Sequence, residues 1–376
     1  MEDKLLLIPG PTNLSRRVRE VMAGPQLPHV GAEFYGTFKE TIQLSRYVFK
    51  NEKGVQFVFT GSGTIGMETA VLSLTAHGDR TLTLNTGYFG KRMLLLNQVH
   101  RNKPDSVDYE DGRHAEPDDL RKRLRKSAYK AVFMTHVETS TGVVNPIREL
   151  VNECNKAGVM SVVDSVCGIA GEELDFDRLG ADVVFTASQK AIAAPPGAVL
   201  LAVSSRAMEY MEKRKDTIES YYMNLPRWKP VMDDPKMYLA TPATQVLLAL
   251  REALREVKEE GLESRWARHR RLGETTRSAL GELGVDILAD DGFRADTITA
   301  FWVEDGKAGA IQKELDEKYN VMVSRGLYEA RDKMIRIGHF GILTADKLKH
   351  ALGQLGSVMD QAGATRRKTV QLAKRK

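Results

Sequence analysis

The sequence predicts an α/β protein whose mostly parallel sheet lies between helices, followed by a smaller α+β region. Two observations support the sheet: short apolar runs rich in β-branched residues alternate with amphipathic segments, and no repeat or low-complexity linker interrupts them. Near-continuous apolar strands separated by helices are typical of parallel sheets buried on both faces. A third observation is length, because 376 residues exceed what one core usually supports, so about two domains are expected.

The large sheet is predicted from six apolar runs: 55–59, 80–86, 130–136, 159–164, 182–186 and 198–203. The amphipathic stretches between them, predicted as helices, are 66–76, 89–99, 117–127 and 146–157. In sheets of this kind ligands bind at the carboxyl ends of the strands. Functional residues are therefore sought just after these runs.

A different pattern begins near residue 242. Thr241 suits an N-cap and Pro242 the first turn of a helix that runs to about Gly261. The elements expected after it are helix 262–283, strand 297–303, helix 308–319, strands 321–324 and 334–338, and helix 345–359. The expected divisions are an N-terminal arm (1–15), a large domain (16–261), a small α+β domain (262–363) and a basic tail (364–376).

Composition excludes several classes of protein. Apolar residues make up 42% and charged residues 28%, which is typical of a soluble globular chain. The run Leu5–Ile8 is too short for a membrane span, and it follows acidic residues, unlike a secretory signal. We therefore expect a cytoplasmic protein without a membrane partner. Cys154, Cys167 and the scattered histidines indicate neither a disulfide framework nor a metal site.

The basic charge belongs to the end of the chain. The net charge is +5, but residues 364–376 hold six Lys or Arg and no acid, so the remaining body carries −1. No aromatic residue interleaves these cations, as stacking on bases would require. A solvated tail is therefore favoured over a nucleic-acid partner.

A glycine-rich turn follows the first strand, in Thr60–Gly66 (TGSGTIG). Such a turn at the start of a helix can bind a phosphate through backbone N–H groups. The segment also fits the dinucleotide pattern G-x-G-x-x-G, which requires an acid at the end of the next strand. That strand ends in Leu84, Asn85 and Thr86. We interpret the turn as a phosphate site for another ligand, with an unliganded structural turn as the alternative.

Asp164 and Lys190 each follow an apolar strand. A buried carboxylate is costly without a partner such as a cationic ring nitrogen, although Asp also caps turns. Lys190 precedes Ala191–Gly197 (AIAAPPG), and a lysine in apolar surroundings can lose its proton and attack a carbonyl. Together with the phosphate site, these residues suggest pyridoxal phosphate, with Lys190 forming a Schiff base and Asp164 at the pyridinium nitrogen.

With these residues in place, the chain resembles the class V aminotransferases, in particular the alanine–glyoxylate / serine–pyruvate group. The matching motifs, in order, are Pro9–Thr12, Gly61–Thr64, Glu138–Gly142, Asp164–Val166, Ser188–Lys190, Ala194–Gly197, Met237–Tyr238 and Ile335–Gly338. They cover almost the whole chain before the tail. The resemblance implies a fold-type-I transferase with a seven-stranded sheet that works as a homodimer.

The resemblance also implies a role for individual residues. Lys190 and Asp164 would be catalytic, Phe89 would stack on the cofactor ring, and Thr139 would bond the ring hydroxyl. The residues expected at the phosphate are Ser62, Gly63, Thr64 and Gln189, with Tyr238 and Thr241 reaching the phosphate of the neighbouring subunit. The residues expected at the substrate are Arg336, which would bind its carboxylate, Gly10 and Arg325.

The expected reaction moves an amino group from alanine or serine to glyoxylate or pyruvate by a ping-pong mechanism. Arg325 stands where relatives often have glycine; pointing into the site it would favour aspartate and 2-oxoglutarate. We expect it instead to face solvent or to pair with an acid such as Glu329. Phe89 and Ala193 also depart from the residues common in relatives. The rivals are a cysteine desulfurase, a dinucleotide-binding oxidoreductase and a tail-driven binding protein.

Overall fold

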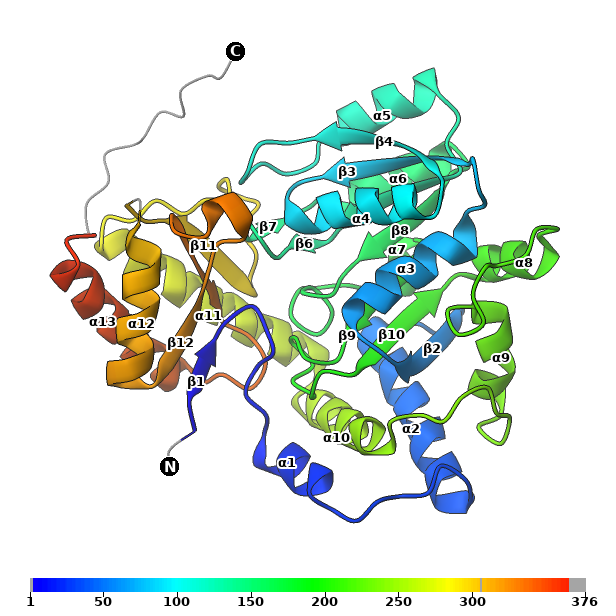
Figure 1. Ribbon diagram of the computed structural model, residues 1–376, viewed down its shortest axis with the longest axis horizontal. Coiled ribbons are helices and arrows are strands. Elements are labelled where there is room, and N and C mark those ends of the chain that lie inside the picture. Colours follow the sequence, from blue (N-terminus) through cyan, green and yellow to red (C-terminus); the bar gives the residue numbers. More distant parts are fainter. Residues whose placement is uncertain (1–2, 305, 365–376) are drawn as a thin grey trace.

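The computed structural model describes residues 3–304 and 306–364. Its centre is a seven-stranded sheet in the order β2-β10-β9-β8-β5-β3-β4 (Figure 1). The strands are β2 (Val55–Thr60), β3 (Arg80–Asn85), β4 (Lys103–Asp108), β5 (Ala131–Thr135), β8 (Met160–Asp164), β9 (Val183–Ala187) and β10 (Ala198–Val203). Neighbours from β9 to β4 pair in parallel, and β10 is antiparallel to β9 and β2. The prediction of a mostly parallel sheet is confirmed.

Helices flank this sheet. They are α2 (Ala32–Phe49), α3 (Gly63–Leu74), α4 (Tyr88–Val99), α5 (Pro117–Lys126), α6 (Ile147–Lys156), α7 (Phe176–Leu179), α8 (Ser205–Lys213), α9 (Leu225–Asp233) and α10 (Thr244–Glu260). A short hairpin, β6 (Val137–Glu138) and β7 (Val143–Val144), follows β5. Within the described ranges, no helix is both long and apolar enough to cross a membrane.

Two of the differences between the local predictions and the structure have a clear physical reason. Strand β4 was not predicted, because its sequence KPDSVD lacks an apolar run; it lies at the sheet edge and is half-buried or exposed throughout. Helix α10 begins at Thr244 rather than at Pro242, with Ala243 as its N-cap. The Thr241 hydroxyl lies 3.0 Å from the Tyr238 hydroxyl. The expected capping role of Thr241 was therefore wrong.

A second, four-stranded sheet has the order β1-β12-β13-β11. Its elements are β1 (Leu5–Leu7), β11 (Ile298–Trp302), β12 (Val321–Arg325) and β13 (Met334–Gly338), accompanied by α11 (Leu262–Glu282), α12 (Lys307–Tyr319), the short 3₁₀ turn η1 (Tyr328–Ala330) and α13 (Ala345–Gln361). Strand β1 pairs in parallel with β12, with Leu5 opposite Val321. The two ends of the chain thus share this small sheet and a core of their own (Figure 1).

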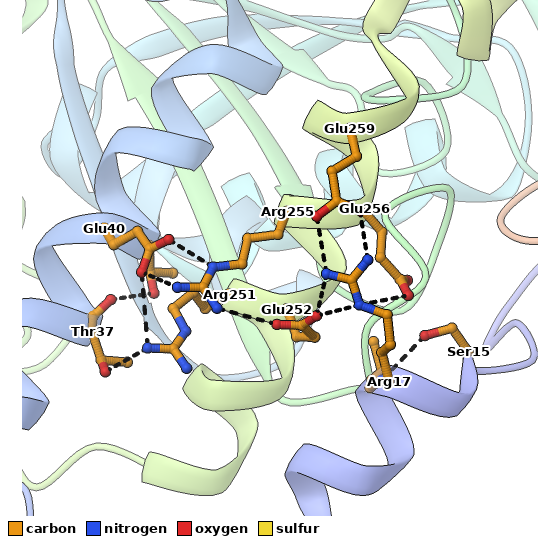
Figure 2. Close-up of polar contacts among 11 residues, drawn as sticks. Ser15, Arg17, Thr37, Glu40, Arg251, Glu252, Arg255, Glu256 and Glu259 are labelled. Atoms are coloured by element: carbon orange, nitrogen blue, oxygen red, sulfur yellow. Dashed lines mark hydrogen bonds and ion pairs between the residues drawn. The ribbon is translucent and has the colours of Figure 1, made fainter.

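Ion pairs fix the chain where it leaves the small sheet. Helix α1 (Arg16–Met22) follows the arm, and Arg17 donates to Glu252 at 2.7 Å and to Glu259 at 2.5 Å on α10 (Figure 2). Arg255 of α10 binds Glu40 of α2 through two 2.7 Å hydrogen bonds. Exposed ion pairs contribute little energy singly, but a network restricts the path of the chain. Apart from Ala364, the predicted tail 364–376 lies outside the described residues.

Candidate active site

A cavity of about 540 Å³ collects residues from three regions of the chain. The arm contributes Gly10, the segments that follow strands of the large sheet contribute Phe89, Thr139 and Lys190, and β13 contributes Arg336. Five predicted site residues that are far apart in sequence therefore line one cavity. It lies beyond the carboxyl ends of the parallel strands, as expected for this class of sheet.

Lys190 lies three residues beyond β9 and is half-buried. Its Nζ donates a hydrogen bond to the carbonyl oxygen of Pro9. Gly10 has a φ of +91°, and a Cβ at this position would lie 2.5 Å from Lys190 Cδ. Gly10 is thus required both by its backbone conformation and by the close approach of the lysine. The arm holds the predicted nucleophile in the cavity.

Asp164 ends β8, which is the parallel neighbour of β9. The side chain is 5% exposed, and its Oδ1 accepts a 3.0 Å hydrogen bond from the Val166 N–H. The pKa of this carboxyl is raised to about 7, chiefly by burial and to a smaller extent by Glu138, against the lowering effects of the Val166 hydrogen bond, Arg92 and Lys190. Among the described residues no cation forms an ion pair with it. A buried acid of this kind suits a protonated ring nitrogen.

The start of α3 offers a place for an anion. Ser62 is the N-cap residue of this 12-residue helix, but its side chain makes no capping hydrogen bond. Thr64 Oγ1 accepts a 3.3 Å hydrogen bond from Arg92. The Gln189 Oε1 atom is buried and has no hydrogen-bond partner among the described residues. The unbonded Ser62 hydroxyl at the free N–H groups of this helix start, and the unbonded Gln189 oxygen, are polar groups of the kind that a phosphate requires.

The segment 138–140 positions two further predicted residues. Both carboxylate oxygens of buried Glu138 accept from the Phe89 N–H, at 3.1 and 3.2 Å, and one also accepts from the Gly90 N–H at 3.2 Å. These bonds hold Phe89 at the start of α4. Burial raises the pKa of Glu138, and hydrogen bonds from Ser140, Phe89 and Gly90 oppose that shift. Thr139 follows directly and lines the same cavity.

Arg336 is 7% exposed, and its partners in the described chain are backbone carbonyls. Its Nε donates to the Arg325 oxygen at 3.0 Å, and its Nη1 donates to the Thr139 oxygen at 3.2 Å. Burial lowers the pKa of this guanidinium. Two of its five N–H groups are used by these bonds, so others remain for a carboxylate ligand.

The Arg325 side chain does not line the cavity. It donates a 2.8 Å hydrogen bond to Asp332 Oδ1, and the pair forms a salt bridge. Pairing with an acid was expected, but the partner is Asp332 rather than Glu329. Since Arg325 still holds Arg336 through its carbonyl oxygen, its contribution to the site comes from the backbone.

Tyr238 and Thr241 lie away from this cavity. Tyr238 is 65% exposed and contacts Thr241 and the ring of His29. Neither residue lines the cavity that holds Lys190, so their predicted role at the phosphate of a second subunit stays a prediction.

Sequence reasoning missed several cavity-lining residues, among them Tyr88, Arg92, Tyr328 and Arg331. Arg92 follows Phe89 by three positions on α4, and that helical spacing could have identified it. Tyr328 comes from η1 in the small-sheet region, and its hydroxyl lies 3.3 Å from that of Tyr88. Nothing local in the sequence indicates this contact.

Comparison with known proteins gives consistent matches. A family described as aminotransferase class-V matches residues 18–344. An uncharacterized aminotransferase of Methanocaldococcus jannaschii is 34% identical over 98% of both chains. Alanine–glyoxylate aminotransferase 1 of Saccharomyces cerevisiae is 32% identical over 91% of this chain and 93% of its own. The crystal structure of ureidoglycine–glyoxylate aminotransferase from Bacillus subtilis has a TM-score of 0.92 and 25% identity, covering 98% of this chain and 95% of its own.

Proposed function

The chain belongs to the class V aminotransferases, which bind pyridoxal phosphate, and from this premise we propose that it transfers an amino group from alanine or serine to glyoxylate or pyruvate by a ping-pong mechanism. The observation that carries the choice of substrate is the pairing of Arg325 with Asp332. It leaves Arg336 to bind the carboxylate that every donor and acceptor shares. The choice of glyoxylate is also supported by the yeast and Bacillus relatives, whose names both include this substrate.

Two residues would carry the proton chemistry. When bound, pyridoxal phosphate withdraws electrons from the α-carbon of the amino acid attached to it. Lys190 would hold the cofactor through Nζ, and after the substrate amine displaces it, the same nitrogen would take the proton from the α-carbon. Asp164 would keep the ring nitrogen protonated, since an ionised carboxylate in this buried place is stabilised by a cation.

The other predicted residues would bind and orient. Phe89 would stack on the ring, and Thr139 would bond its hydroxyl. The phosphate would be held by Ser62, Gly63, Thr64 and Gln189. Arg336 would grip the substrate carboxylate with a planar pair of N–H groups, while Gly10 leaves room for Lys190 beside it.

We also propose a homodimer with shared active sites. Tyr238 and the adjacent Met237 are 65% and 53% exposed, an unusual state for large apolar side chains. Tyr238 and Thr241 would reach the phosphate bound by the neighbouring subunit. The support is their exposure together with their absence from the lining of the described cavity of their own chain.

A panel of substrates tests the proposed reaction. Alanine, serine and aspartate are each assayed as donors with glyoxylate, pyruvate and 2-oxoglutarate, using the wild type and Arg325→Gly. We expect alanine or serine with glyoxylate or pyruvate to exceed aspartate with 2-oxoglutarate at least about tenfold in kcat/KM. The Arg325→Gly variant should keep this ratio. A preference for aspartate that is lost selectively in Arg325→Gly would overturn the proposal.

A further inference from the structure

Arg92 occupies an unusual position between the stacking residue and the start of α3. Its guanidinium donates to Thr64 Oγ1 at 3.3 Å and to the Tyr88 hydroxyl at 3.2 Å. The guanidinium carbon lies 4.7 Å from the ring centre of Phe89 and 4.9 Å from that of Tyr88. Aromatic faces and hydroxyl groups hold the cation in one place.

Arg92 has no ion-pair partner among the described residues, and it acts on Asp164 only at longer range, where it lowers the pKa of that carboxyl. In the described part of the chain no carboxylate lies within ion-pair distance of this half-buried side chain. Elsewhere, other half-buried guanidinium groups are paired, as Arg255 is with Glu40 and Arg277 with Asp296. A fixed cation without a counter-charge, at the edge of a cavity, attracts an anionic ligand.

The hydrogen bond to Thr64 directs this charge toward α3. Thr64 lies in the first turn of α3, beside the Ser62 hydroxyl that makes no capping bond. Because Thr64 Oγ1 accepts from Arg92, its own hydrogen is free to donate to something else. The first turn of a helix already favours an anion.

We propose that Arg92 is a positioning residue for the cofactor phosphate, acting through the Thr64 hydroxyl and supplying a positive charge that the described phosphate-site residues of this chain lack. The proposal rests on the assignment of the start of α3 as the phosphate site in the proposed function. It also links two ends of the cofactor site, because the same guanidinium packs against Phe89, the residue proposed to stack on the ring.

The alternative is that Arg92 binds the substrate, since it lines the same cavity as Lys190 and Arg336. The two roles differ in the group that Arg92 would interact with, which is either the cofactor phosphate or the substrate. A phosphate role weakens binding of pyridoxal phosphate but not of pyridoxal, which lacks the phosphate. A substrate role leaves both ligands unaffected and raises the KM of the substrates.

The test titrates the cofactor-stripped full-length protein with each of these two ligands and follows the absorbance of the lysine-bound form. Arg92→Gln should weaken binding of pyridoxal phosphate at least about tenfold more than binding of pyridoxal. Lys91→Gln is the matched control, because it removes the same charge from an exposed neighbour on the same helix. It should change neither affinity more than about twofold.

Two further variants complete the test. Arg92→Lys keeps the charge and should recover part of the lost affinity for pyridoxal phosphate. Thr64→Val combined with Arg92→Gln should weaken binding less than the product of the two single effects, because both act on one hydrogen bond. Equal losses for the two ligands, or an equal loss in Lys91→Gln, would overturn the proposal. If the enzyme does not use glyoxylate or pyruvate, the proposed reaction is refuted. The relative loss of affinity for pyridoxal phosphate and pyridoxal in Arg92→Gln still tests the role of Arg92 separately.

Discussion

Asp164→Asn should stabilise the cofactor-free protein at high pH while impairing the enzyme. The Asp164 carboxyl has its pKa raised from 3.8 to about 7, chiefly by burial. Between these values the folded chain retains a proton that the unfolded chain has lost, so the free energy of unfolding falls as pH rises. Asparagine does not titrate, and its side-chain oxygen can still accept from the Val166 N–H.

The size of this effect follows from the pKa difference. Relative to a pH low enough to protonate the carboxyl in both states, this single group lowers the free energy of unfolding of the wild type by about 1.5 kcal/mol at pH 5 and by about 4 kcal/mol at pH 8. The pH-independent effects of the amide, including about 1–3 kcal/mol for an unsatisfied N–H group, do not alter the difference between the two pH values. The stability of Asp164→Asn relative to the wild type should therefore rise by about 2.5 kcal/mol from pH 5 to pH 8.

Chemical denaturation of both cofactor-free proteins, at one fixed protein concentration, measures this difference. Burial also raises the pKa of Glu172 to about 8. Glu172 adds the same pH dependence to the free energy of unfolding of both proteins, so its effect cancels in their difference. With saturating pyridoxal phosphate, the wild type should be stabilised more than the variant, and the variant should transfer amino groups far more slowly. A pH-independent difference between the cofactor-free proteins would refute the claim that Asp164 is held as a costly buried acid.

Three further predictions concern the proposed site. Lys190→Ala should lower kcat at least about 10⁴-fold and leave a bound cofactor that borohydride does not fix to the protein; wild-type turnover would rule out the assigned role. Arg336→Lys should raise the KM of every donor and acceptor about tenfold in steady-state assays, because a point charge cannot replace the planar fork, and an unchanged KM would contradict carboxylate binding. Mixing Lys190→Ala with Tyr238→Ala subunits at equal amounts should restore about a quarter of wild-type activity, since half of the dimers then hold one intact site. Verified subunit exchange without recovery would exclude Tyr238 from acting in the neighbouring site.

The sequence by itself determined the residues whose meaning depends on their immediate neighbours. Apolar strands are recognisable because burial on both faces leaves a continuous run, and the polar residues that end or follow them stand out, as Asp164 and Lys190 do. The order of the two strands in the chain, with one connection between them, also predicted that these residues share one edge of the sheet. The proposed cofactor followed from that placement.

Tertiary structure decided whatever depends on contacts between distant segments. The edge strand β4 is half-buried and has no apolar run, so no local pattern reveals it. Strand β1 joins a sheet made by residues more than 290 positions later, and this pairing, with the Thr12 N–H bond to the Gln189 oxygen, holds Gly10 against Lys190. The acid that pairs with Arg325 also depends on the fold, which places Asp332 rather than Glu329 within hydrogen-bond distance of its side chain. The spacing of Arg92 from Phe89 is visible in the sequence, but its hydrogen bond to Thr64, on another helix, depends on the fold. The burial of a strand can be predicted from the order of apolar and polar residues along the chain. Ion pairs and close contacts between distant residues depend instead on how the packed core arranges the segments.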